Sequence, residues 1–94
     1  MKFNYETDRI YVKNDEGKIV VLATFPMKEG GIVDINHTFV DPSLRGTGLG
    51  VKLMEEFYDY AKKQGYKVIA TCPFAVKWFE KYPEKQDILL KWIY

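Results

Sequence analysis

The chain has 94 residues, of which 47% are hydrophobic and 16% aromatic, so it is long enough for one small domain, residues 1–94, with a packed core. Fourteen basic and thirteen acidic residues give a formal net charge of +1, and without a long basic run we expect no binding to nucleic acids. A single cysteine excludes an internal disulfide, and the lack of a signal-peptide core or a membrane-length apolar stretch favours a cytoplasmic domain without membrane contact.

Three short runs rich in Val, Ile and aromatic residues are predicted as strands: Tyr5–Val12, Lys18–Phe25 and Ile32–Val40. Turn-forming residues at Asn14–Gly17 and Pro26–Gly31 separate them. Because these connections are short, the three strands should pair as an antiparallel meander. Pro42 has no N–H to donate and should end the pairing.

The second half of the sequence predicts a long helix, a strand and a short helix. The long helix covers about Gly48–Gln64 and ends at Gly65, which is suited to a left-handed C-terminal cap. Its apolar positions fall along one face: Leu49, Leu53, Met54, Phe57 and Ala61. Tyr66–Thr71 should form a strand parallel to the third one, because a helix connects them. Phe74–Tyr82 is predicted as a second helix, and Asp87–Tyr94 as either a last strand or an irregular tail.

The most informative segment is the glycine-spaced turn Leu44–Gly50, which lies between the third strand and the long helix. Glycines leave the backbone N–H groups of such a turn unshielded, and the positive end of the helix dipole lies behind them, so the turn is suited to phosphate. Arg45 adds a cation whose forked donors match phosphate oxygens. The sequence therefore predicts a site for a phosphorylated small molecule, and the alternative is a turn that only starts the helix.

Two common phosphate loops do not fit these residues. A Walker loop needs Lys and then Ser or Thr directly after its last glycine, but Gly50 is followed by Val51. A dinucleotide loop needs a third glycine where Val51 stands and an acidic residue at the end of the next strand, which ends at Thr71 instead. The pattern R-x-x-G-x-G is matched by Arg45, Gly48 and Gly50, and it resembles the coenzyme A pyrophosphate loop of the GCN5-related N-acetyltransferases (GNAT).

Further parts of the chain resemble the same family, and in particular its very small, YjdJ-type single-domain members. These parts span about residues 30–83 and comprise His37-Thr38-x-Val40, Arg45–Gly50, Tyr60-Ala61 with Gly65, Lys67-Val68 and Cys72-Pro73-Phe74. The resemblance implies a minimal GNAT fold of the α/β (α+β) class, in which an antiparallel meander turns parallel at its third and fourth strands and carries two helices. One departure is Tyr82-Pro83, where this subgroup usually has His-Pro, so a base role for that histidine cannot be carried over, although Tyr82 could still supply a hydroxyl.

The resemblance also implies acetyl-CoA (coenzyme A carrying the acetyl group) as the co-substrate. Its pyrophosphate would lie on the backbone of a loop made of Arg45, Gly46, Thr47, Gly48, Leu49 and Gly50. The amides of its pantetheine arm would pair with the strand edge at Phe39 and Val40. Phe74 belongs to an aromatic C-terminal region that mostly packs in the core, and it is the candidate to cover the arm, the alternative being an apolar patch for a partner.

Cys72 ends the fourth strand at the sheet edge where the loop also lies, so we expect both in one crevice. Because a helix follows Cys72 and a helix N-terminus raises thiolate content, this residue could accept the acetyl group before the amine does. It could instead line the thioester pocket or handle a proton, or be a small buried residue of the core.

His37 is the only histidine, and its titration range suits a general base. It lies on the strand next to that of Cys72, but strand alternation could turn it either toward Cys72 or away from it. With one His and one Cys, typical ligands for a transition metal are too few, so we predict no metal site.

The sequence thus predicts an acetyl-CoA-dependent N-acetyltransferase that acts on an unidentified amine, either a small molecule or a protein lysine, with Cys72 and His37 as candidate catalytic residues. The alternative is a CoA- or acyl-CoA-binding sensor or interaction module without turnover, because so short a domain has little surface to position an acceptor. The sequence defines neither the acceptor nor the oligomeric state.

Overall fold

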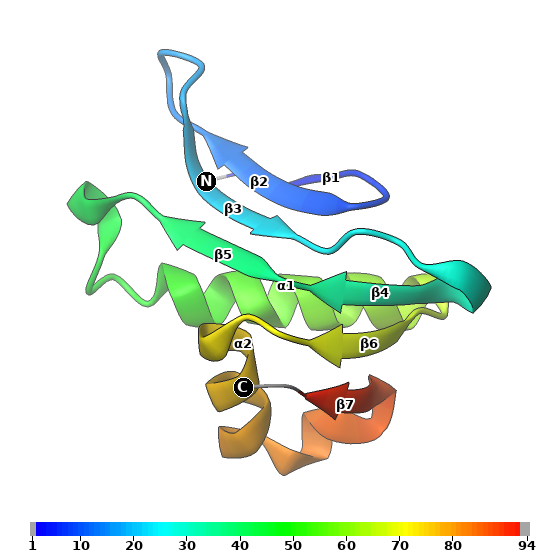
Figure 1. Cartoon of the computed structure of the whole chain (residues 1–94). Helices are drawn as coiled ribbons and strands as arrows, with labels where there is room; N and C mark the ends of the chain where they lie inside the picture. Colours follow the sequence, from blue (N-terminus) through cyan, green and yellow to red (C-terminus); the bar gives the residue numbers. More distant parts are fainter. Residues whose placement is uncertain (1, 93–94) are drawn as a thin grey trace.

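The computed structural model describes residues 2–92, which form two small sheets and a long helix (Figure 1). The strands are β1 (Asn4–Tyr5), β2 (Arg9–Lys13), β3 (Ile19–Thr24), β4 (Ile32–Ile35), β5 (His37–Val40), β6 (Lys67–Ala70) and β7 (Leu89–Trp92). The helices are α1 (Leu49–Gln64) and α2 (Pro73–Lys81), with 3₁₀ turns η1 (Glu29–Gly31), η2 (Pro42–Leu44) and η3 (Pro83–Ile88). One sheet is antiparallel with the order β1-β2-β3-β5, and the other is parallel with the order β4-β6-β7.

The N-terminal strand differs from its prediction. A single strand over Tyr5–Val12 is wrong, because the chain turns back after Tyr5: the Glu6 N–H donates to the Arg9 carbonyl at 2.8 Å, and the two side chains pair at 3.0 Å. β1 and β2 therefore form a small hairpin of their own. β2 and β3 then pair antiparallel, as the meander requires.

The predicted third strand, Ile32–Val40, is divided in two at Asn36. The Asn36 N–H donates to the Thr24 carbonyl at 3.2 Å although His37 is the residue opposite Thr24, so Asn36 is an extra residue in this strand, a β-bulge. On its two sides the chain takes different partners: β4 pairs parallel with β6, and β5 pairs antiparallel with β3. The predicted change from antiparallel to parallel pairing is confirmed, and it occurs within this one stretch of chain.

The parallel pairing ends where the bulge begins. The Ile35 carbonyl accepts hydrogen bonds from both the Thr71 and the Cys72 N–H, each at 3.1 Å. Beyond this point β5 continues in the antiparallel sheet, while the chain after β6 turns into α2, so the two strands diverge (Figure 1). This divergence opens the molecule next to the start of α1.

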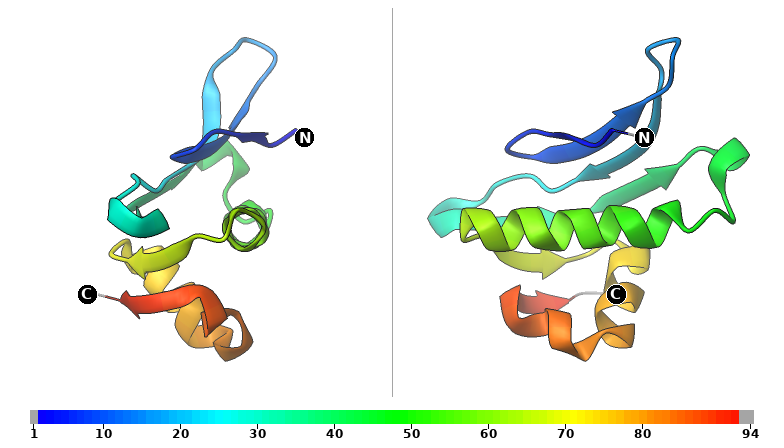
Figure 2. Two further views of the ribbon diagram at one scale, coloured as in Figure 1. Left: turned by 90° about the vertical axis from the view of Figure 1, so that its right-hand side faces the viewer. Right: turned by 180° about the vertical axis from the view of Figure 1, so that it is seen from behind.

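The helix α1 packs against the sheets on one side, as its end-on view in Figure 2 shows. Its bounds agree with the prediction, and Gly65 closes it with φ 76°. The apolar face is buried against the sheets through Leu53, Met54, Phe57, Tyr58 and Ala61. The Phe57 ring lies 4.9 Å from that of Phe25, centroid to centroid, at the middle of the core.

The C-terminal part adds α2 and a last strand. The predicted helix over Phe74–Tyr82 is confirmed with a shift of one residue. Of the two alternatives for Asp87–Tyr94, the structure has a strand, because β7 pairs parallel with β6; residues 93 and 94 lie outside the described part. None of the helices within residues 2–92 combines the length and the apolar character that a membrane crossing needs.

Candidate functional site

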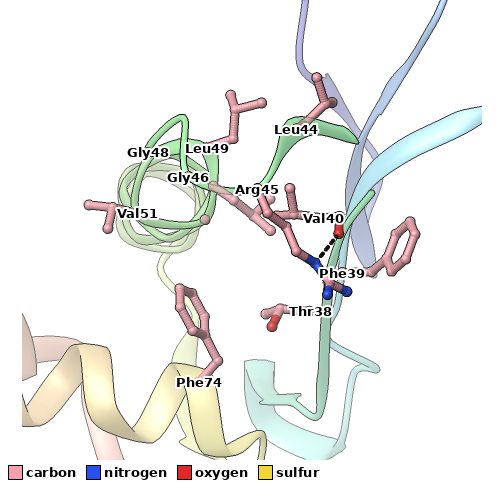
Figure 3. Close-up of a pocket in the computed structure, with 12 residues that line it drawn as sticks. Thr38, Phe39, Val40, Leu44, Arg45, Gly46, Gly48, Leu49, Val51 and Phe74 are labelled. Atoms are coloured by element: carbon pink, nitrogen blue, oxygen red, sulfur yellow. Dashed lines mark hydrogen bonds between the residues drawn. The ribbon is translucent and has the colours of Figure 1, made fainter. Parts of the chain in front are cut away.

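A cleft of about 470 Å³ lies where β5 and β6 diverge. It is lined by β5, by the loop that follows β5 together with the start of α1, and by the first turn of α2, which is distant from them in the sequence (Figure 3). Most of the predicted ligand-binding residues are among its walls, namely Phe39, Val40, Arg45, Gly46, Gly48, Leu49, Gly50 and Phe74. Four lining residues were not predicted: Thr38, Leu44, Val51 and Leu53.

The loop at the cleft presents backbone N–H groups. Gly46 and Gly48 both have φ 81°, a left-handed conformation that a residue with a side chain rarely adopts. The hydrogen-bond ladder of α1 starts with the Lys52 N–H, which donates to the Gly48 carbonyl at 3.0 Å, so the N–H groups just before Lys52 have no acceptor in the helix. Gly48 provides no side-chain cap, and the first turn has no acidic residue. This helix terminus is therefore electropositive and accessible to an anion.

Side chains within the loop hold its shape. The Asp41 carboxylate accepts hydrogen bonds from the Ser43 N–H at 3.0 Å and from the Ser43 hydroxyl at 2.7 Å, and these bonds lower the pKa of Asp41. The Thr47 hydroxyl donates to the Leu44 carbonyl. Thr47 does not line the cleft, and its side chain stabilises the loop through this hydrogen bond.

Arg45 extends from the loop over β5. Its Nε donates to the Val40 carbonyl at 3.2 Å, which holds the guanidinium beside the cleft (Figure 3). This hydrogen bond uses the Nε donor of the Arg45 guanidinium and leaves the donors of its two terminal nitrogens. The terminal nitrogens remain available to a ligand, and Figure 3 shows them beside β5.

Two residues of β5 turn their backbone groups toward the cleft. The Asp41 N–H donates to the Val20 carbonyl at 2.8 Å, and hydrogen-bonded pairs alternate along an antiparallel ladder. In this register Phe39 bonds to β3, whereas Thr38 and Val40 direct their N–H and C=O groups away from β3. The donor of Arg45 reaches Val40 from this free side. The edge available to an extended ligand therefore consists of the Thr38 N–H and C=O groups and the Val40 N–H, while the Val40 carbonyl is held by Arg45.

Phe74 forms the wall opposite β5. Its ring lies directly over Gly50: a Cβ atom at Gly50 would be 2.9 Å from Phe74 Cζ. The ring is 42% exposed, which is unusual for so large an apolar side chain, and it faces the opening in Figure 3. A glycine at position 50 is thus required for this ring position.

Cys72 lies behind the cleft wall. Its side chain is only 7% exposed, and it does not line the cleft. Its Sγ is 3.4 Å from the hydroxyl of Thr38, which does line the cleft. The thiol is therefore one side chain away from the cleft, and Thr38 is the group in between.

Of its two possible orientations, the His37 side chain has the one that points away from Cys72 and into solvent. It is exposed, and it precedes Thr38 in the strand, so its side chain points to the opposite face from the one where Thr38 meets Cys72. The structure does not bring His37 and Cys72 together. Among residues 2–92, no group of three or more His, Cys, Asp or Glu side chains is placed to hold a metal ion.

Residues 9–88 match a known family described as GCN5-related N-acetyl-transferase. The chain belongs to this GNAT family. The match includes β2 to η3 and therefore every segment that lines the cleft. Both the predicted family and the predicted fold class are confirmed.

Known proteins similar to this GNAT domain differ in how much of their length they share with it. A GCN5-like candidate N-acetyltransferase from Staphylococcus aureus is 29% identical with a TM-score of 0.77, over 96% of this chain and 88% of its own. An acetyltransferase from Bacillus cereus is 34% identical with a TM-score of 0.54, over 64% of this chain and 43% of its own. An uncharacterized N-acetyltransferase from Methanocaldococcus jannaschii is 40% identical over 38 residues, and the chain spans 17% of its length.

Tyr82, for which the sequence left a hydroxyl role open, lies away from the cleft. Tyr82 caps the C-terminal end of α2, whereas Cys72 precedes the N-terminal end. The two are separated by the length of the helix, roughly 14 Å at 1.5 Å per residue. The Tyr82 ring packs 5.4 Å from that of Trp78, so its contacts are those of a core residue.

Proposed function

We propose that this protein is an N-acetyltransferase that transfers the acetyl group of acetyl-CoA to an amine of a small molecule or a protein lysine. One observation carries the proposal: an electropositive loop, Arg45–Gly50, lies in one cleft with the edge of β5 at Thr38 and Val40, where the Thr38 backbone groups and the Val40 N–H point away from β3. Coenzyme A has this same sequence of chemistry, a diphosphate followed by an arm with two amides. A chain in the GNAT family with such a cleft is suited to hold it in an extended form.

The loop would hold the diphosphate by its N–H groups and the Arg45 guanidinium. The pantetheine amides would exchange hydrogen bonds with the backbone of β5, and the Phe74 ring would cover the arm. A thioester carbonyl at the point where the strands diverge would then lie near backbone donors that can stabilise its developing negative charge. Thr38 lines the cleft in this region, and Cys72 lies behind it with its sulfur 3.4 Å from the Thr38 hydroxyl.

Mass spectrometry and a turnover assay test this function together. The purified protein is incubated with acetyl-CoA, with and without a panel of amines that includes polyamines and lysine peptides, and release of the CoA thiol is measured. Acceptor-dependent release supports acetyl transfer, and an added acetyl mass that is absent in Cys72→Ala supports a covalent route through Cys72. Tight CoA binding without acceptor-dependent release would favour a sensing or interaction module instead.

A further inference from the structure

The walls of the cleft differ in exposure from one end to the other. Leu53, which follows Leu49 by one turn of α1, lines the cleft and is nevertheless fully buried, with 0% of its surface exposed. At the loop end, in contrast, several lining residues are exposed: Arg45, Gly46, Gly48 and Val51. The cleft is therefore open to solvent at the loop and closed at Leu53.

The closed end has a second wall on β5. Figure 3 shows the Thr38 side chain on the side of β5 that is turned to Phe74. Behind it lies the buried Cys72, whose sulfur is 3.4 Å from the Thr38 hydroxyl, so packed side chains support this wall. Of the residues that line the cleft within 2–92, Arg45 alone is charged, and it lies at the loop end. The closed end is thus suited to a small group without charge.

We propose that Leu53 and Thr38 determine which acyl group this protein accepts, because they close the end of the cleft that receives it. This inference rests on the proposed function, in which the diphosphate of CoA lies at the loop and the pantetheine arm follows β5. The acyl group at the far end of that arm then reaches the closed end. Protein interiors are densely packed, so each methylene beyond an acetyl group has to displace Leu53 or Thr38.

Calorimetric titration with CoA, acetyl-CoA, propionyl-CoA and butyryl-CoA tests this selectivity without any turnover. For each protein the dissociation constant of every acyl-CoA is divided by that of CoA, so that changes at the loop cancel. We expect the native protein to bind butyryl-CoA at least about tenfold more weakly than acetyl-CoA, with propionyl-CoA in between, because one methylene in a fitted pocket changes affinity by about tenfold or more. In Leu53→Ala the difference between butyryl-CoA and acetyl-CoA should fall to about threefold or less, since the longer chain no longer displaces the leucine.

Met54→Ala is the matched control for Leu53→Ala. Met54 is the next residue of α1 and is fully buried like Leu53, but it does not line the cleft. Its truncation leaves a cavity in the same core and should destabilise the fold in a similar way, whereas the native ratio of butyryl-CoA to acetyl-CoA affinity should remain. Equal affinity of the native protein for both acyl-CoAs would overturn the proposal, as would the same change of ratio in Met54→Ala as in Leu53→Ala.

Thr38→Ala replaces Leu53→Ala if circular dichroism shows that the leucine variant does not fold. It shortens the opposite wall at a half-buried position and should also reduce the difference between butyryl-CoA and acetyl-CoA, and an unchanged difference would overturn the proposal. A native protein that discriminates acyl chains but releases no CoA thiol with any amine would support this inference and contradict acetyl transfer. CoA binding with no discrimination would overturn the inference alone, and the absence of CoA binding would overturn both.

Discussion

At the scale of single residues, Arg45 connects the two halves of the cleft, since its guanidinium is bound to Val40 on the strand and belongs to the loop. We expect Arg45→Gln to weaken CoA binding roughly tenfold, because charge-assisted hydrogen bonds to the diphosphate are lost. Arg45→Lys keeps the charge but lacks the forked donors, so its affinity for CoA should lie between those of the native protein and Arg45→Gln. Calorimetric titration measures both variants. Native affinity in Arg45→Gln would show that the loop N–H groups act without this side chain.

Gly50 and Phe74 form a coupled pair. Alanine in a helix is more stable than glycine by roughly 0.5–1 kcal/mol, but a Cβ at position 50 would be 2.9 Å from the Phe74 ring. We therefore predict that Gly50→Ala gives the full gain in the free energy of unfolding only in a Phe74→Ala background. In the native background the ring must first be displaced. Urea denaturation of the four proteins of this double-mutant cycle gives the coupling, and additive effects would contradict the close contact.

Thr38 shows what could not be predicted at this scale. The motif His37-Thr38-x-Val40 is visible in the sequence, but which of its side chains meets Cys72 depends on strand alternation. The bulge at Asn36 shifts that alternation by one residue. As a result Ile35 and Thr38 share the core face, whereas a regular strand would place Ile35 and His37 there. The bulge depends on pairing with β3, a long-range contact that the local sequence does not encode. The positive φ angles of the loop, in contrast, could be predicted from the sequence, because glycine is the residue that adopts them readily.

At the scale of elements, the C-terminal part is tied to α1 by a polar cluster. The Asp87 carboxylate, in η3, accepts hydrogen bonds from the Lys62 ammonium at 2.9 Å and from the Tyr58 hydroxyl at 2.7 Å. The bond from Lys62, followed by that from Tyr58, lowers the pKa of Asp87. These contacts join the end of α1 to the segment that leads into β7.

The lowered pKa of Asp87 gives a pH dependence with a defined sign. The folded protein favours the carboxylate, so this contribution to stability is fully present above the ordinary pKa of an aspartate, about 4, and is lost as the pH falls below it. We predict that Asp87→Asn is less stable than the native protein at neutral pH and that this difference shrinks toward about pH 3. Urea denaturation across this range measures it, and a difference that does not change with pH would contradict the assignment. The effect should be small, since the cluster is exposed.

The order of helices and strands could be predicted from the sequence, but the division of two predicted strands, Tyr5–Val12 and Ile32–Val40, into two strands each could not. The meander, α1 with its closing Gly65, and α2 follow from periodicity, turn residues and caps. The run Ile32–Val40 looks like one strand in the sequence, although β4 and β5 belong to different sheets. What separates them is the choice of partner strand, and partner choice depends on the whole fold.

At the scale of the whole molecule, the cleft lies where the two sheets diverge beside the start of α1. Figure 2 shows α1 along one side of the sheets. The helix α1 lies on one face of the antiparallel sheet, and within residues 2–92 no helix covers the opposite face. The loop, β5 and Phe74 line one cleft, as predicted, whereas Cys72, which was predicted to lie in the same crevice, is buried behind its wall. The convergence was available from the sequence because the carboxyl ends of neighbouring strands bring distant loops together.

Binding of coenzyme A at the loop is the central claim, and residue-resolved NMR of backbone amides during a CoA titration tests it most directly. We expect the largest shifts at the amides of Gly46–Gly50 and of Thr38 and Val40, and we expect acetyl-CoA and CoA to differ mainly near Cys72. Dephospho-CoA, which keeps the diphosphate, should give the same loop shifts. Unchanged spectra at millimolar CoA, or shifts confined to residues outside the cleft, would contradict the account.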